Sequence, residues 1–189
     1  MNVRGWMTFL AAACAVATAG AARATEWRGD PAASRLAIAA TFEGASVPGS
    51  FRKFDVRLRW DPANPAASSL DVTIEVASAD FGIADVNREI VKREWFDASA
   101  HPQAVFRSRD LARLDADRFR ARGTLTLKGV ARSVEVPFTL IVRQEGATLE
   151  GALVLQRGSF GIGEGEWAAT TVIGADVKVS FALKLVPVP

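Results

Sequence analysis

Apolar and polar residues alternate with a period of two along most of the chain after Thr25. Successive side chains of a strand point to opposite faces of a sheet, so this pattern predicts strands with one apolar and one mixed face. The stretches that show it are 36–42, 54–60, 70–76, 119–127, 134–142, 149–155 and 177–185. Strands with one face in water are typical of antiparallel sheets rather than of buried parallel ones.

Short, turn-like connections join these stretches, as at 61–65, 128–130 and 144–146. Proline, glycine and asparagine in such segments favour tight turns. Seven or more strands joined in this way predict a β-sandwich or a closed barrel. Alternation alone does not separate the two architectures.

One segment, 85–99, departs from the two-residue period. Its apolar residues Val86, Ile90, Val91 and Trp95 are spaced closer to a helical period. Asp85 suits the N-cap position, so we expect a short helix that ends near 95–97. The chain then returns to a strand through Val105 and Phe106.

The first 24 residues have the pattern of a secretory signal peptide. Arg4 supplies positive charge, residues 6–16 form an apolar run too short to span a bilayer, and 22–24 (ARA) form a cleavage site. We therefore expect a mature protein of residues 25–189 that forms a single domain outside the cytoplasm. A disordered or membrane-anchored N-terminus is one alternative. A lipid anchor on Cys14 is another, although Leu10 lies one place too early for the usual lipoprotein motif.

Composition narrows the chemistry of the mature chain. Cys14 is the only cysteine and leaves with the signal, so no disulfide or thiolate ligand remains. Two of the 23 basic residues, Arg4 and Arg23, leave as well, and the remaining 21 balance 21 acidic residues. A neutral chain without basic runs does not favour nucleic-acid binding. No second apolar stretch is long enough for a membrane helix.

Catalytic and metal-binding patterns are also missing from the sequence. His101 is the only histidine, it precedes a proline, and no serine has a nucleophile motif. The usual zinc ligand set is absent. The glycine-rich segment 161–165 does not join a strand to a helix, so a flexible rim loop explains it better than a phosphate loop. We expect no catalytic residues, no metal and no cofactor.

Aromatic residues are abundant: ten Phe and four Trp remain after residue 24. They are consistent with an ordinary filled core and with the wall of an apolar ligand cavity. A closed barrel of about eight strands can be either filled or just wide enough for a ligand.

Four blocks of sequence resemble the motifs of the YceI-like family, in order and over most of the mature chain. The blocks are Trp27 to Ile38 with 47–54 (VPGSFRKF); 87–90 (NREI) with 95–97 (WFD) and 101–108 (HPQAVFRS); 123–130 (GTLTLKGV); and 156–162 (QRGSFGI) with 172–177 (VIGADV). Ser159 stands where the family usually has an acid, and His101 where tyrosine is common. These departures concern the ligand more than the fold.

The resemblance implies an all-β, antiparallel, lipocalin-like barrel of about eight strands with one short helix. It also implies a periplasmic protein that binds a long amphiphilic isoprenoid, such as a polyprenyl phosphate or a prenyl quinone, and performs no catalysis. On apolar parity and motif position we expect the ligand to contact Phe54, Leu58, Ile74, Trp95, Phe106, Leu125, Phe138, Leu153, Phe160 and Phe181. Arg157 is either a headgroup partner or a structural donor to loop carbonyls, and the sequence leaves both roles open.

A different reading of the same pattern is a structural or interaction module whose barrel is filled. Glycine-rich rim loops and a neutral net charge fit either reading, and the sequence leaves a homodimer open. Lipid extracted from the purified protein would separate the two.

Cleavage of the signal is directly measurable. We expect N-terminal sequencing of the exported protein to begin at Thr25, because the cleavage motif ends at Ala24. A retained Met1, or a lipid attached to Cys14, would contradict this prediction.

Overall fold

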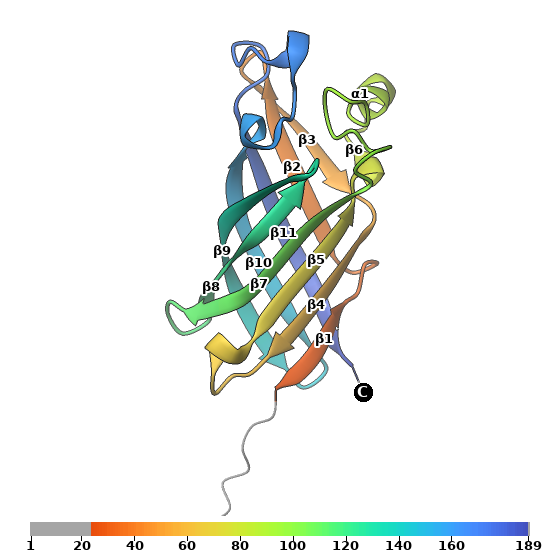
Figure 1. The fold of residues 1–189 in the computed structure, drawn as a ribbon. Helices are drawn as coiled ribbons and strands as arrows, with labels where there is room; N and C mark the ends of the chain where they lie inside the picture. Colours follow the sequence, from red (N-terminus) through yellow and green to blue (C-terminus); the bar gives the residue numbers. More distant parts are fainter. Residues whose placement is uncertain (1–23, 189) are drawn as a thin grey trace, which may run out of the picture.

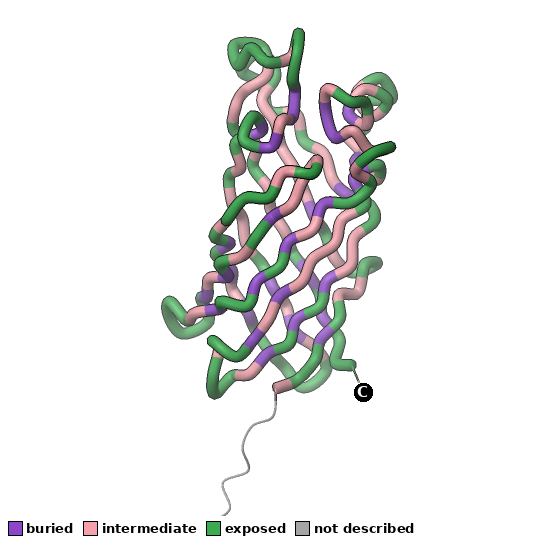
Figure 2. The backbone as a smooth tube through the Cα atoms, in the orientation of Figure 1, coloured by how far each residue is buried: buried purple, intermediate pink, exposed green. Residues whose placement is uncertain are grey.

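A computed structural model describes residues 24–188, so the expected signal peptide lies, apart from Ala24, outside the described residues. Eight antiparallel strands close into a barrel (Figure 1). In order around the barrel they are β1 (Thr25–Gly29), β4 (Phe54–Trp60), β5 (Ser69–Glu75), β7 (Gln103–Arg113), β8 (Arg118–Leu127), β9 (Val130–Arg143), β10 (Gly146–Gln156) and β11 (Asp176–Pro187). The predicted antiparallel barrel is confirmed, and Figure 2 shows the alternation of buried and exposed positions along its strands.

The barrel is wider at one end because β11 changes partner along its length. Its C-terminal part pairs with β1, from Gly29 opposite Leu185 to Trp27 opposite Pro187. Its middle part pairs instead with β2 (Arg35–Phe42), which continues through β3 (Ala45–Phe51) to the two-residue β6 (Ala79–Asp80). The extra strands join the wall in one half only, and a wall of more strands encloses a wider interior.

The narrow half of the barrel, which we call the base, is packed solid. The Trp60 and Phe119 rings meet edge to face with centroids 4.8 Å apart, and the Phe119 and Phe138 rings stack at 5.8 Å. Leu58 and Leu185 fill the space beside them and are 1 % exposed. The alternative of a filled barrel therefore describes the base alone.

Two loops cover the wide end, and we call them the roof: residues 81–101 and 157–175. The first contains α1 (Ala84–Glu89), and the second contains the 3₁₀ turns η3 (Arg157–Phe160) and η4 (Gly165–Trp167). Two further 3₁₀ turns lie elsewhere, η1 (Pro65–Ala67) and η2 (Val76–Ser78). The Glu94 carbonyl joins the roof loops by accepting hydrogen bonds from the backbone N–H groups of Gly163 (2.8 Å) and Glu164 (3.0 Å).

The short helix is present, but its expected bounds were wrong. The helix begins after Ile83, so Asp85 lies in its first turn rather than at the N-cap, and it ends at Glu89 instead of near 95–97. Trp95 and Phe96 are both buried. After the helix the backbone continues in tight turns, in which the Trp95 N–H donates to the Lys92 carbonyl and the Phe96 N–H to the Ile90 carbonyl. None of the described helices is long and apolar enough to cross a membrane.

Truncating the base should cost more stability than truncating the wall of the wide half. Phe138→Ala removes a ring that is 3 % exposed and stacked on Phe119, so we expect a loss of about 3–5 kcal/mol. Phe181→Ala removes a half-buried ring in the wide half and should cost clearly less. Urea unfolding of both variants measures the difference, and the reverse order would contradict a packed base.

Candidate ligand cavity

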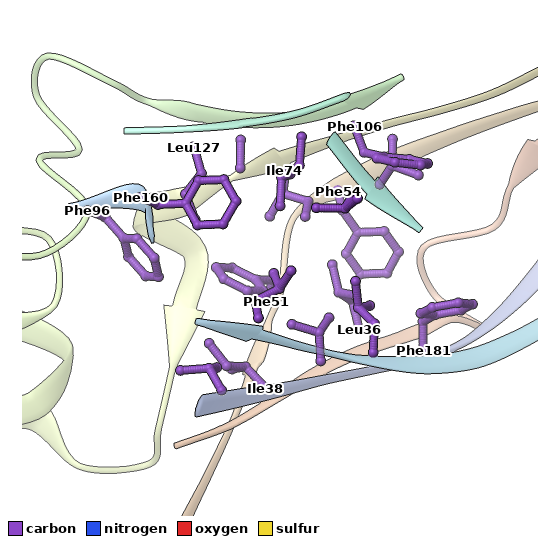
Figure 3. A pocket seen from close by; sticks show the side chains of 18 of the residues that line it. Leu36, Ile38, Phe51, Phe54, Ile74, Phe96, Phe106, Leu127, Phe160 and Phe181 are labelled. Atoms are coloured by element: carbon purple, nitrogen blue, oxygen red, sulfur yellow. The ribbon is translucent and has the colours of Figure 1, made fainter. Parts of the chain in front are cut away.

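The wide half of the barrel encloses a cavity with a volume of about 190 Å³. Strands β2 to β5 and β7 to β11 all contribute wall residues, and Trp95, Phe96, Phe160 and Ile162 close it from the roof. A single water needs roughly 15 Å³ of such space, so the cavity has room for much more than one water molecule. The side chains that surround it converge from opposite walls in Figure 3.

The exposed wall of the cavity is entirely apolar. Its labelled side chains in Figure 3 are Leu36, Ile38, Phe51, Phe54, Ile74, Phe96, Phe106, Leu127, Phe160 and Phe181, all hydrocarbon. Such a wall offers a ligand no hydrogen bond, and an empty apolar cavity of this kind binds hydrocarbon rather than water. The cavity therefore suits a hydrocarbon chain and excludes a polar group.

Nine of the eleven expected site residues line this cavity. They are Phe54, Ile74, Trp95, Phe106, Leu125, Leu153, Arg157, Phe160 and Phe181. Leu58 and Phe138 do not, because the structure places both in the base. Strand parity predicts which side chains point into the barrel. It does not predict whether an inward side chain lies in the packed base or in the hollow wide half.

Several wall residues were not anticipated. Leu36, Ile38 and Phe51 come from the β2–β3 hairpin, and Phe81 and Phe96 come from the first roof loop. Parity and the resemblance motifs already contained a signal for Leu36, Ile38, Phe51 and Phe96. Phe81 had none, since its position depends on side-chain contacts within the loop.

A polar clamp holds Phe81 in the wall. The Asn87 carbonyl oxygen accepts the Phe81 N–H at 2.8 Å, while the Asn87 amide donates to Asp80 at 2.6 Å. Asp80 also accepts the Gly82 N–H and pairs with Arg52. These hydrogen bonds, that from Gly82 first, lower the pKa of Asp80 to about 2, so the clamp stays charged at ordinary pH.

Arg157 lies inside the second roof loop, where neutral backbone carbonyls surround its guanidinium. It is 5 % exposed. Its Nε donates to Gly174 (3.0 Å), its Nη1 to Ile162 and Gly163 (both 2.9 Å), and its Nη2 to Trp167 (2.8 Å), Ile173 (3.0 Å) and Ala169 (3.3 Å). Burial lowers the pKa of this guanidinium. Six acceptors occupy all five N–H groups, so the geometry favours the structural role over contact with a headgroup.

The loop around Arg157 has no room for a side chain at Gly163. A β-carbon there would lie 2.1 Å from Arg157 Nη1, and the φ of +73° is one that residues with side chains rarely adopt. The glycine-rich segment 161–165 was expected to be a flexible rim loop. The structure instead ties it to Arg157 and to Glu94, so it forms a fixed part of the roof.

Other chemistry does not gather at the cavity. Residues 24–188 contain no cluster of three or more His, Cys, Asp or Glu side chains arranged to hold a metal ion. His101 lies outside the cavity, with its ring against Gly129.

Comparison with known proteins now identifies the fold family. The model of the YceI-like domain family matches residues 27–185. The chain belongs to the YceI-like family. It is 33% identical over 135 residues to a UPF0312 protein of Pectobacterium atrosepticum, which covers 70% of each chain. It is also 33% identical over 93 residues to protein YceI of Escherichia coli O157:H7, over 49% of this chain and 48% of the relative.

Solved YceI-like structures share this barrel. BcnA of Burkholderia cenocepacia is 34% identical with a TM-score of 0.80, over 82% of this chain and 98% of BcnA. A polyisoprenoid-binding domain from Saccharophagus degradans, implicated in plant cell wall breakdown, has a TM-score of 0.70 at 15% identity, over 86% of this chain and 98% of that domain. At that identity the likeness concerns the fold alone.

Removing Arg157 from this YceI-like protein should loosen the roof. In Arg157→Met six carbonyls lose their donor, those of Ile162 and Gly163 on buried residues, so we expect a loss of about 3–5 kcal/mol in urea unfolding. Faster hydrogen exchange at the Gly163 and Glu164 amides should accompany it. Arg157→Lys keeps the charge but has only three N–H groups, so it should restore part of the stability. Normal stability with lost ligand binding would instead assign Arg157 to the ligand.

Proposed function

We propose that this YceI-like protein binds a long amphiphilic isoprenoid lipid, such as a polyprenyl phosphate or a prenyl quinone, with the hydrocarbon tail in its cavity. The single observation that supports this best is the cavity wall, which exposes only apolar atoms. Burying a methylene group in such a wall contributes about 0.8 kcal/mol, so an isoprene unit contributes on the order of 4 kcal/mol. The affinity then comes from the tail.

The headgroup stays outside the cavity in this proposal. A phosphate or quinone oxygen inside would lose its water without gaining a donor, which costs several kcal/mol. Arg157 could not help, since its N–H groups already bond to the roof carbonyls. The lipid therefore lies with its polar end toward the surface of the wide half.

We place this activity in the periplasm and assign it to binding rather than catalysis. The N-terminal sequence pattern supports export, and the family resemblance points to a secreted protein. The cavity wall contains no nucleophile, acid or base that could act on a ligand. A structural module with a filled barrel is less well supported, because the wide half of this barrel contains a cavity.

Direct extraction tests the proposal. The exported protein is purified, extracted with organic solvent and analysed by mass spectrometry. We expect a prenyl lipid in stoichiometric amount. Extracts that contain none, together with no binding of added prenyl quinone, would overturn the proposal and favour the interaction module.

Filling the cavity should prevent binding without unfolding the barrel. Ile74 on β5 points into the cavity, whereas its neighbour Thr73 points outward. We expect Ile74→Trp to weaken binding of a prenyl quinone about tenfold or more, because the indole occupies space that the tail needs. Thr73→Trp is the matched control and should bind like the wild type. Fluorescence titration measures both, and equal affinities would contradict tail binding in the cavity.

A further inference from the structure

In the wide half, strand pairing is interrupted between β9 and β10. The ladder between β9 and β10 ends where Gly151 faces Phe138. Beyond that point β9 stays paired to β8 as far as Val130, and β10 stays paired to β11 as far as Gln156. The two strands diverge toward the roof (Figure 1). We call the unpaired edges, 130–137 of β9 and 152–156 of β10, the seam.

Pro137 explains why the ladder stops there. A β-carbon on Gly151 would lie 2.4 Å from the Pro137 carbonyl oxygen, so this carbonyl faces β10. The N–H and C=O of one residue in an antiparallel strand point to the same side. Pro137 therefore presents to β10 a nitrogen without a hydrogen, and the ladder loses a bond at its first position in the seam.

The inner side of the seam is cavity wall. Val134 and Val136 on β9 and Leu153 and Leu155 on β10 all line the cavity. Separation of these two edges would therefore open the cavity directly to solvent. No backbone bond would have to break along the seam itself.

Side chains, not backbone, hold the seam closed near the roof. Lys128, at the tip of the β8–β9 hairpin, donates to the Gly161 carbonyl at 2.5 Å and to Glu164 at 3.0 Å. Arg132 donates to the Ser159 carbonyl at 3.1 Å. We call these two basic side chains the latch. They connect the hairpin to the second roof loop across the seam.

The backbone conformation at Lys128 supports a functional role for its side chain. Lys128 has a φ of +50° and is followed by Gly129 at +74°, which is the pair of left-handed residues of a tight hairpin turn. Asparagine or glycine suits the first of these positions better than lysine. An uncommon backbone state is held here by a residue whose side chain is 11 % exposed and whose ammonium makes two hydrogen bonds, which suits a function for that ammonium.

The roof is held more firmly than the seam. Arg157 makes six bonds within the second roof loop, and the Glu94 carbonyl binds that loop to the first through two backbone N–H groups. The seam has three side-chain bonds, one of them to the exposed Glu164. The seam is therefore held less firmly than the roof.

We propose that the seam is the portal through which a hydrocarbon ligand reaches the cavity, and that Lys128 and Arg132 are the latch that closes it. The proposal rests on the proposed function for the nature of the natural ligand. The portal itself concerns any apolar molecule that reaches the cavity.

Lys128→Asn tests the latch. Asparagine suits the left-handed turn, so this variant should fold at least as well as the wild type while it loses the reach to Gly161. We expect association and dissociation rate constants both to rise about five- to tenfold, with little change in Kd, because the latch is a barrier in both directions. Lys53→Asn is the control: it removes the exposed Lys53–Glu75 pair on the opposite wall and should leave both rates unchanged.

Two probes are used in stopped-flow fluorescence. A prenyl quinone with two isoprene units quenches Trp95 in the cavity wall, and 1-aminoanthracene is an apolar fluorophore that is not a lipid. If the quinone fails to bind at equilibrium, the proposed function fails. The portal is then still decided by the aminoanthracene kinetics.

A reversible crosslink tests the seam itself. In a Cys14→Ser background, Arg132→Cys with Ser159→Cys is bridged by a short bis-methanethiosulfonate reagent, and Glu94→Cys with Glu166→Cys is bridged in the same way as a roof control. We expect the seam bridge to slow association of both probes at least about tenfold, with recovery after dithiothreitol. The roof bridge should leave the rates unchanged. Unchanged rates with the seam bridged, or slowing by the roof bridge instead, would overturn the portal.

Discussion

A single buried guanidinium organises the functional end of this barrel. Arg157 donates hydrogen bonds to six carbonyls between residues 162 and 174. No other described side chain donates so many hydrogen bonds to one loop. Without this donor, these loop carbonyls would need water or other donors as hydrogen-bond partners. Because the guanidinium and these carbonyls satisfy one another, neither presents an unpaired polar group to the cavity. The cavity can then be apolar although a charged residue lies in its wall.

The second constraint is the partner change of β11. With β1 beside it the barrel has a narrow, aromatic-filled base, and with β2 beside it the barrel is wide enough to remain hollow. Base and cavity therefore have separate tasks. The base is densely packed and supplies much of the stability. The wide half is less densely packed and contains the cavity. This division explains why the aromatic content of the chain was consistent both with a filled core and with the wall of a cavity.

Much of this architecture was accessible from sequence. Two-residue alternation predicted the strands and their inward faces, so residues such as Phe106 and Phe181 were placed correctly on the cavity wall. Leu58 and Phe138 were misplaced because depth along the barrel depends on which strand pairs with which, and that information is long-range. The role of Arg157 required the path of a whole loop. The early end of the helix is followed by turns whose backbone bonds, such as that from Phe96 to Ile90, the apolar spacing did not indicate.

The packed base has a further consequence for the kind of cargo this barrel suits. With Trp60, Phe119 and Phe138 filling one end, the hollow half is a blind tube. Under the proposed function, the lipid tail enters it with its free methyl end deepest. The depth from roof to base then acts as a molecular ruler: a tail of matching length fills it, a shorter one leaves a void, and a longer one keeps its excess outside. Selectivity would then be for the length of the tail, and the position of these three aromatic rings would set that length.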